Sequence, residues 1–189
     1  MKRLPKNYAW HFVGKTLRDG SPIPPDGEWL TFAGECIMCQ SGLHASRNPF
    51  DALQYTPGNT LCLVEVADIV EEQSDKLVCR KRKIIARMDA TELCQYFARY
   101  AALSVVHLWD APDGVLDFLM TGKNAAEAAW AAAGAARAAG AAETAWAAAW
   151  AAARAAGAAI DASAADSTWA ALRNEFTQLV YESFEEYLP

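Results

Sequence analysis

The sequence lacks the motifs that assign a nucleotide-binding function directly. Neither GxGxxG nor GxxxxGK followed by Ser or Thr occurs in its 189 residues, which excludes the dinucleotide-binding fingerprint and the P-loop. Histidine is scarce as well, because His11, His44 and His107 are the only three. No Ser/His/Asp or Cys/His spacing of a nucleophilic site can be argued from them, so motifs alone give no catalytic residue.

Long apolar runs are missing too. The first residues, MKRLPKNYAWHF, contain no apolar stretch of signal-peptide length. The long alanine-rich stretch is a poor membrane segment, and charged residues such as Arg137 and Arg154 interrupt it. We therefore expect no membrane span. The five cysteines are an odd number, which is typical of reduced thiols and predicts a cytoplasmic protein.

Metal ligands are also too few. Cys36 and Cys39 form the motif CIMC, with His44 close behind. A structural zinc site needs four ligands, and no second CxxC or histidine pair completes this one. A redox role is weaker still, since nothing places the motif at a helix N-terminus. We expect structural thiols and no metal site.

Composition and charge divide the chain into two parts. Residues 1–123 contain 14 Lys and Arg and 15 Asp and Glu, whereas residues 124–189 contain 3 and 8 and most of the alanine. Neither part has the basic balance of a general nucleic-acid-binding protein. The sequence predicts an α+β ligand-binding domain over residues 1–122 and an alanine-rich, all-helical tail over residues 123–189.

The first part carries strand and helix patterns in turn. Alternating or apolar runs predict strands at YAWHFV (8–13), EWLTF (29–33), GLHAS (42–46), TLCLVEVA (60–67) and KLVCRKRKIIARM (76–88). Asn48 followed by Pro49 predicts a short helix, PFDALQY, with Asn as its N-cap. Asp89 with Glu92 three residues later predicts a capping box and a longer helix.

The tail should be almost wholly helical over residues 124–187. Alanine has the highest helix propensity, and the other residues recur at spacings of three and four. Gly140 and Gly157 are candidate helix ends, which would fold the tail into neighbouring helices. Its tryptophans must be covered by another surface, because exposed they would favour aggregation. We therefore expect a homo-oligomer that forms through the tail.

The basic run Arg80-Lys81-Arg82-Lys83 lies within a predicted strand. Strand alternation places Arg80 and Arg82 on one face. One interpretation is a solvated strand edge that balances the acidic residues of 71–75. The other is a phosphate clamp built from the two arginines.

One segment carries a resemblance to a known family. GLHASRNPFDALQY (42–55) is followed by LCLVEVA (61–67), with YAWHFVG (8–14) upstream. These motifs resemble the ADP-ribosyltransferase fold of the poly(ADP-ribose) polymerase type, over about residues 8–88. The resemblance implies a mixed sheet and a ligand such as NAD or a related nucleotide. It implies that His11 contacts the adenosine ribose and that a flat ring is sandwiched between His44 and Tyr55.

The chain departs from that family at the positions that matter for catalysis. Phe12 stands where the family has glycine, Ala52 replaces its serine, and no glutamate occupies a convincing catalytic position after Asp75. The arginines in that strand rather resemble relatives that remove a phosphate from RNA. We therefore expect a nucleotide-binding protein without the usual transferase chemistry, with His11, His44, Tyr55, Arg80 and Arg82 as ligand-binding residues.

The whole chain also resembles a family of uncharacterised bacteriophage and prophage proteins, through LWDAP and FLMTG followed by the Ala/Arg/Trp tail. This resemblance implies a phage origin and the cytoplasm of the host cell, where the protein could sequester a host signalling nucleotide. Two alternatives stay open. One is an active ADP-ribosyl- or RNA phosphotransferase-like enzyme, and the other is a structural oligomerisation protein without a ligand.

Overall fold

A computed structural model of the chain describes residues 4–108, 113–123, 147–148, 150–152 and 162–189. The chain divides into two compact units, Met1–Ala90 together with Thr177–Pro189, and Thr91–Phe176. The predicted boundary after residue 122 lies inside the second unit, so composition and compactness divide the chain differently.

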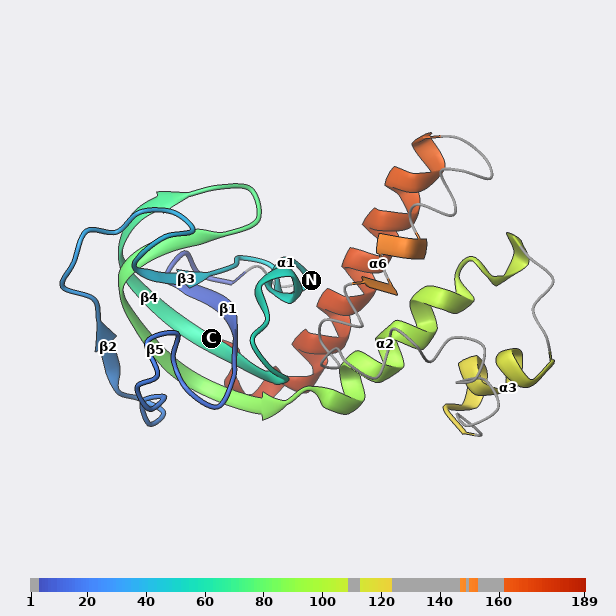
Figure 1. The fold of residues 1–189 in the computed structure, drawn as a ribbon, viewed down its shortest axis with the longest axis horizontal. Helices are drawn as coiled ribbons and strands as arrows, with labels where there is room; N and C mark the ends of the chain where they lie inside the picture. The colour runs from blue at the N-terminus through green and yellow to red at the C-terminus, as the bar shows by residue number, and fades with distance from the viewer. Residues whose placement is uncertain (1–3, 109–112, 124–146, 149, 153–161) are drawn as a thin grey trace. The chain divides into compact units, whose positions relative to one another are not determined.

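An antiparallel sheet forms the framework of the first unit (Figure 1). Its strands are β1 (Tyr8–Val13), β2 (Trp29–Thr31), β3 (Leu43–Ala45), β4 (Thr60–Glu72) and β5 (Leu77–Asp89). Their order is β1-β4-β5-β2, and β3 also pairs with β5. All five predicted strands are present, which confirms the α+β class.

The expected mixed sheet was wrong, because every strand pairing that the structure describes is antiparallel. A parallel pair needs a crossover of a dozen or more residues. β4 and β5 are instead joined directly by the short turn between Glu72 and Leu77. β4 continues five residues beyond its predicted end at Ala67, since its polar second half pairs with the start of β5.

Register shifts bend the long β4–β5 hairpin. They lie between Leu63 and Val64 and between Ile69 and Glu71. Asp68, directly before the second shift, adopts a positive φ of 55°. This backbone conformation is typical of bulges. Bulges bend strands and increase their twist, and both strands are strongly curved in Figure 1.

The edge of β1 is joined to the residue after β3. The backbone of Trp10 exchanges two hydrogen bonds of 2.8 Å with the backbone of Ser46, which form an isolated antiparallel bridge. β1 is therefore held between β4 on one side and the end of β3 on the other. Small and β-branched side chains, among them Ala9, Val13 and Val64, fill the core beneath.

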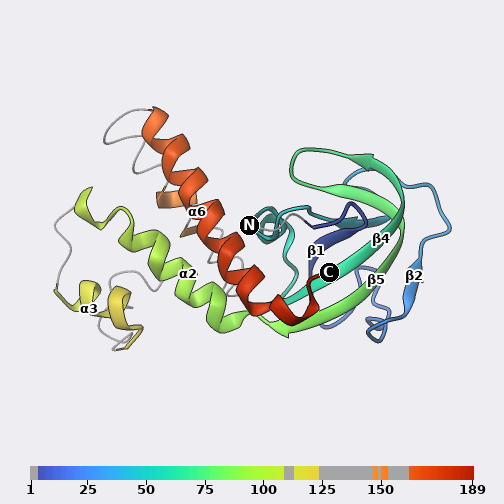
Figure 2. The same cartoon turned by 180° about the vertical axis from the view of Figure 1, so that it is seen from behind.

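A short helix and the C-terminal segment complete the first unit. α1 (Pro49–Ala52) begins at Asn48, whose side chain accepts a hydrogen bond from the Phe50 backbone as predicted, and η1 (Leu53–Tyr55) follows it. The long helix α6 (Ala162–Ser183) precedes the C-terminal residues (Figure 2). Phe184, which follows this helix, packs edge-on against Trp10 with ring centroids 5.1 Å apart. Both rings are fully buried, so the C-terminal residues contribute to the core of the sheet unit.

The second unit is helical in the part that the structure describes. Its elements are α2 (Thr91–Leu103), η2 (Val106–Leu108), α3 (Asp113–Thr121) and the first part of α6. α2 begins at Thr91 rather than at the predicted Asp89, because β5 extends to that residue. Phe97 of α2 packs on Phe176 of α6 with ring centroids 4.9 Å apart.

The prediction of a helical tail is testable only in part. α6 confirms a helix over the end of the tail, and η3 (Glu185–Tyr187) follows it. Most of residues 124–161, with Trp130, Trp146, Gly140 and Gly157, lie outside the described residues. Among the residues that the structure describes, no helix is both long and apolar enough to cross a membrane.

Candidate ligand-binding pocket

A pocket of about 280 Å³ lies in the first unit, where several of its short elements meet. The lining residues come from β1 and the loop after it, from the segment around β3, from α1 and η1, and from the turn between β4 and β5. They are Trp10, His11, Arg18, Cys39, His44, Ala45, Ser46, Ala52, Tyr55 and Lys76.

Three of the five predicted site residues meet in this pocket. His11, His44 and Tyr55 all line it. The bridge between Trp10 and Ser46 explains the convergence, because it places β1 beside the end of β3. Neighbouring residues on those two elements then face one cavity. The short helix after Pro49 brings Tyr55 to the same place.

The imidazole ring of His44 is held by the backbone, because Nε2 accepts a hydrogen bond of 3.0 Å from the Cys39 backbone N–H. Burial lowers the pKa of His44, the Gly42 backbone opposes this effect, and the nearby charge of Arg82 lowers the pKa further. The imidazole is therefore neutral at pH 7, and its fixed ring can offer a flat face to a ligand.

His11 is more enclosed than His44. It stands opposite Cys62 of β4 in the strand register. Burial lowers the pKa of His11 well below its usual value of 6.5, and the charge of Arg82 and the neighbouring His44 add to this effect. A neutral imidazole at this position can donate or accept a hydrogen bond without carrying a charge.

The two predicted arginines do not line the pocket. Arg80 is exposed, and its guanidinium donates a 2.8 Å hydrogen bond to the Gly34 carbonyl. Arg82 is buried and donates to the backbone carbonyl of His44. Burial lowers the pKa of Arg82 to about 10, so it stays charged at pH 7 and acts on the pocket through the strand that carries His44.

Tyr55 belongs to a chain of polar contacts at the pocket rim. Its hydroxyl donates to the Asp75 carboxylate and accepts a 3.1 Å hydrogen bond from Lys76 Nζ. The same ammonium lies 4.9 Å from the centroid of the Tyr55 ring. Burial and the bond to Asp75 raise the pKa of Tyr55. The phenol is therefore protonated at pH 7, which suits ring stacking better than proton abstraction.

The lining residues that sequence reasoning did not assign to the site include Arg18, Cys39 and Lys76. Arg18 lies in the loop after β1 and Lys76 in the β4–β5 turn, and neither belongs to a motif. Arg18 was a charge outside the predicted elements, and Lys76 was the first residue of the strand predicted over residues 76–88. Among the described residues that line the pocket, none carries a carboxylate.

The CIMC segment supplies one exposed and one buried thiol. Cys36 is buried, and its thiol donates to the Cys79 carbonyl at 3.7 Å, whereas Cys39 is exposed at the pocket. Cys39 adopts a positive φ of 65°, which points its backbone N–H toward His44. Within the described part of the chain, no group of three or more His, Cys, Asp or Glu side chains could hold a metal ion.

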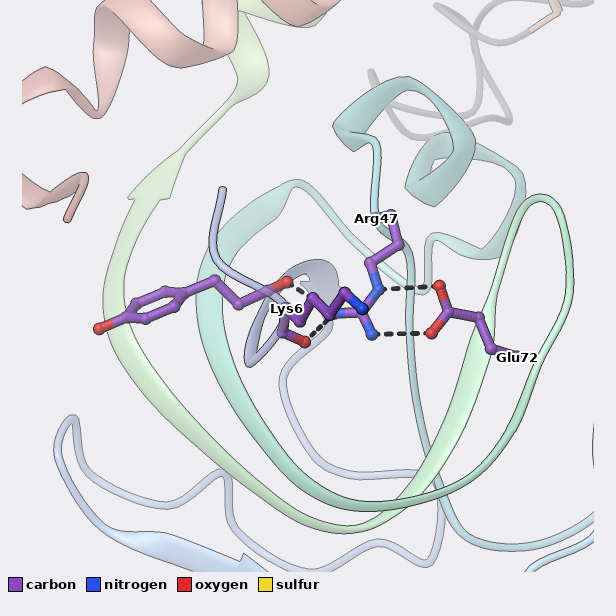
Figure 3. A network of polar contacts seen from close by, with 4 residues as sticks. Lys6, Arg47 and Glu72 are labelled. Atoms are coloured by element: carbon purple, nitrogen blue, oxygen red, sulfur yellow. Dashed lines mark hydrogen bonds and ion pairs between the residues drawn. The ribbon is translucent and has the colours of Figure 1, made fainter. Parts of the chain in front are cut away.

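A second pocket, of about 300 Å³, is lined by Arg47, Glu72 and neighbouring residues. Figure 3 shows that the Arg47 guanidinium and the Glu72 carboxylate in this pocket are engaged with each other. Arg47 Nε and Nη2 donate to the two Glu72 oxygens at 3.0 and 2.8 Å. Arg47 Nη1 donates to the carbonyls of Lys6 and Tyr8 at 2.6 and 3.0 Å. This arrangement joins three segments of the fold and leaves the first pocket as the candidate site.

The first unit thus combines an antiparallel sheet and short helices with a pocket that Arg18 and Lys76 line. Residues 7–96 match the model of a family described as a domain of unknown function (DUF7666), and this match includes every residue that lines the pocket. No curated protein and no solved structure matches the chain. Because that family description names no activity, function has to be argued from the chemistry of the pocket.

Proposed function

We propose that the first unit binds a nucleotide-like ligand whose flat ring lies between His44 and Tyr55. The observation that carries this proposal is the meeting of both side chains, with His11, in one pocket. Aromatic rings attract one another in offset or edge-to-face arrangements. A neutral imidazole held by its hydrogen bond from the Cys39 backbone and a protonated phenol offer suitable faces for a base.

The pocket supports binding better than catalysis. A transferase of the resembling type needs a glutamate, and none of the described lining residues is acidic. The buried Arg82 supports the fold behind His44 and is not placed to clamp a substrate with Arg80. In a phage-type protein, such a pocket would sequester a host signalling nucleotide in the cytoplasm, with NAD as one ligand to test.

The tail would add self-association to this function. Trp150 is 53% exposed in the described part of the second unit and contacts Trp169 edge-on at 5.7 Å. A second copy of the chain is the partner that we propose for this surface, and light scattering of the intact protein would show the resulting mass. A monomeric mass at micromolar concentration would contradict this part of the proposal.

A thermal-shift screen tests the binding proposal. A ligand at 100 times its dissociation constant adds about 2.7 kcal/mol to the free energy of unfolding, so NAD, ADP-ribose, cyclic nucleotides and nucleosides can be compared directly. His44→Ala should abolish the shift. His107→Ala is the matched control, because that exposed histidine lies in the second unit. A shift that survives His44→Ala would refute the stacking site.

A further inference from the structure

The candidate pocket has a charge opposite to that of the chain. The protein carries a formal net charge of −6, yet the described lining residues include Arg18, Lys76 and two histidines and no carboxylate. The nearest acidic group named in the site, Asp75, is engaged by the Tyr55 hydroxyl. Positive charges gathered in a concave site attract anions.

Arg18 is the least engaged of these cations. Within the part of the chain that the structure describes, its guanidinium makes no hydrogen bond and no ion pair, and the residue is exposed. Arg18 and Lys76 lie near enough to His44 to lower the pKa of that imidazole. Two cations from separate loops are therefore directed at one small volume.

The size of the pocket limits its ligand. About 280 Å³ is slightly below the roughly 300–1,000 Å³ that is usual for small-molecule sites. Such a volume suits one ring, one sugar and one phosphate better than a dinucleotide with two of each. Size therefore argues against NAD as the ligand that fills this pocket.

We propose that the pocket binds a nucleoside monophosphate, whose terminal phosphate lies between the Arg18 guanidinium and the Lys76 ammonium. This inference rests on the proposed function, because the same ligand places its base between His44 and Tyr55. Arginine presents paired N–H donors that match phosphate oxygens, and lysine adds a point charge. The dianion of a phosphomonoester would be neutralised by these two cations.

Cys39 provides a direct reporter of occupancy. It lines the pocket and is the exposed member of the five cysteines, since Cys36, Cys62, Cys79 and Cys94 are buried. A thiol reagent should therefore label the folded protein at Cys39 first. A ligand in the pocket should slow that reaction in proportion to its occupancy.

The experiment measures the protection of Cys39 from iodoacetamide by AMP, GMP, CMP and UMP, each beside its nucleoside, with NAD and inorganic phosphate alone. We expect one monophosphate to protect with an affinity at least about tenfold above that of its nucleoside, the usual effect of a charge-assisted hydrogen bond. Calorimetry with the same probes gives the dissociation constants without a covalent label.

Two charge-removing variants locate the phosphate. Arg18→Gln should bring the affinity for the monophosphate down to that for the nucleoside. Lys15→Gln removes a cation from the same loop at an exposed position that does not line the pocket, so it should keep the wild-type affinities. Neither residue has a partner in the fold among the described contacts, and circular dichroism of both variants should match that of the wild type.

The outcomes separate this inference from the binding proposal. If nucleoside, monophosphate and NAD bind equally well, or if Arg18→Gln changes nothing, the phosphate site is refuted while ring binding stands. If inorganic phosphate binds as tightly as every monophosphate, the phosphate site stands and the stacking site is refuted. If none of the probes protects Cys39 or gives heat, both proposals are wrong.

Discussion

The backbone N–H of Cys39 donates a 3.0 Å hydrogen bond to Nε2 of His44. This contact fixes which nitrogen is the acceptor, because a neutral imidazole has one donor and one acceptor. It also depends on an unusual backbone, since Cys39 has a φ of 65°. The loop that carries CIMC therefore positions a pocket histidine. Cys39 and His44, which together suggested metal ligands, are instead joined by a hydrogen bond from the Cys39 backbone to the His44 ring.

Stability should fall when the solution is acidified below the usual histidine pKa. The pKa of His11 is lowered by burial and by Arg82 and His44, so the unfolded chain takes up a proton near pH 6.5 that the folded chain does not. The free energy of unfolding then decreases as pH falls, by at most about 1.4 kcal/mol per pH unit for this residue. Above pH 6.5 His11 should have no effect.

Urea unfolding at pH 7.5 and pH 5.5 measures this dependence. The lowered pKa values of Glu65 and Glu72 act only at lower pH, where these carboxylates become protonated. His11→Asn should reduce the difference between the two pH values, because it removes a group whose pKa is lowered on folding. An unaltered difference in His11→Asn would show that another group is responsible.

Much of the site was predictable because short-range patterns determine its backbone. The apolar alternation around His11 specifies a strand, and Asn48-Pro49 specifies the helix that brings Tyr55 to the pocket. Arg18 was missed because loops have no periodicity from which to infer a direction. Lys76 was missed because it was taken as the first residue of a predicted strand, whereas β5 begins at Leu77. The clamp of Arg80 and Arg82 was inferred from strand alternation, which does not show that one guanidinium is buried and the other exposed.

Replacing Gly42 by alanine should distort the strand that carries His44. Gly42 has a φ of +100°, and an added Cβ would lie 2.7 Å from Val78 Cγ2 and 3.0 Å from Cys36 Sγ. Strained backbone of this kind costs about 1–3 kcal/mol, and the contact with Val78 adds to it. We expect a loss of unfolding free energy in that range, measured by urea titration.

A second alanine variant separates the cost of the backbone conformation from the cost of the close contacts around the added Cβ. Gly20 also has a positive φ, of 84°, but no atom lies within 4 Å of its added Cβ. Gly20→Ala should therefore lower the free energy of unfolding only through its strained backbone, and by less than Gly42→Ala does. Equal costs would mean that the packing against Val78 and Cys36 relaxes freely.

The last residues of the chain should be necessary for the first unit. Val180 and Phe184 are buried, and Phe184 covers Trp10. Truncating a buried aromatic side chain to alanine costs about 3–5 kcal/mol, so Phe184→Ala should destabilise the sheet unit. Hydrogen exchange of the β4 amides would show this directly, and a chain that ends at residue 122 should lose their protection.

Tyr187, which is 53% exposed, provides the control for that experiment. Tyr187→Ala should leave β4 protection nearly unchanged. The C-terminal contribution could not be predicted from the sequence, because the amphipathic pattern of the last helix gives an apolar face but not the surface it meets. Composition therefore placed the domain boundary at the start of the alanine-rich stretch, after residue 122. In the structure, residues Thr177–Pro189 belong to the first unit.

Arg47 and Glu72 should contribute unequally to stability although they form one ion pair. The pair is partly exposed, with side-chain exposures of 30% and 44%, and such pairs contribute only about 0–1 kcal/mol. Glu72→Ala should therefore have a small effect. Arg47→Ala also removes the donor to the carbonyls of Lys6 and Tyr8, and the second of these bonds is partly buried.

An unsatisfied buried acceptor costs about 1–3 kcal/mol, so Arg47→Ala should be more destabilising than Glu72→Ala by about 1 kcal/mol or more. Urea titrations of both single variants and of the double variant measure the difference. The double variant should have the same free energy of unfolding as Arg47→Ala. Without the guanidinium, the Glu72 carboxylate no longer has the ion pair that its removal would break. Equal effects of the two single variants would mean that the ion pair, and not the two carbonyl contacts, is what Arg47 supplies to the fold.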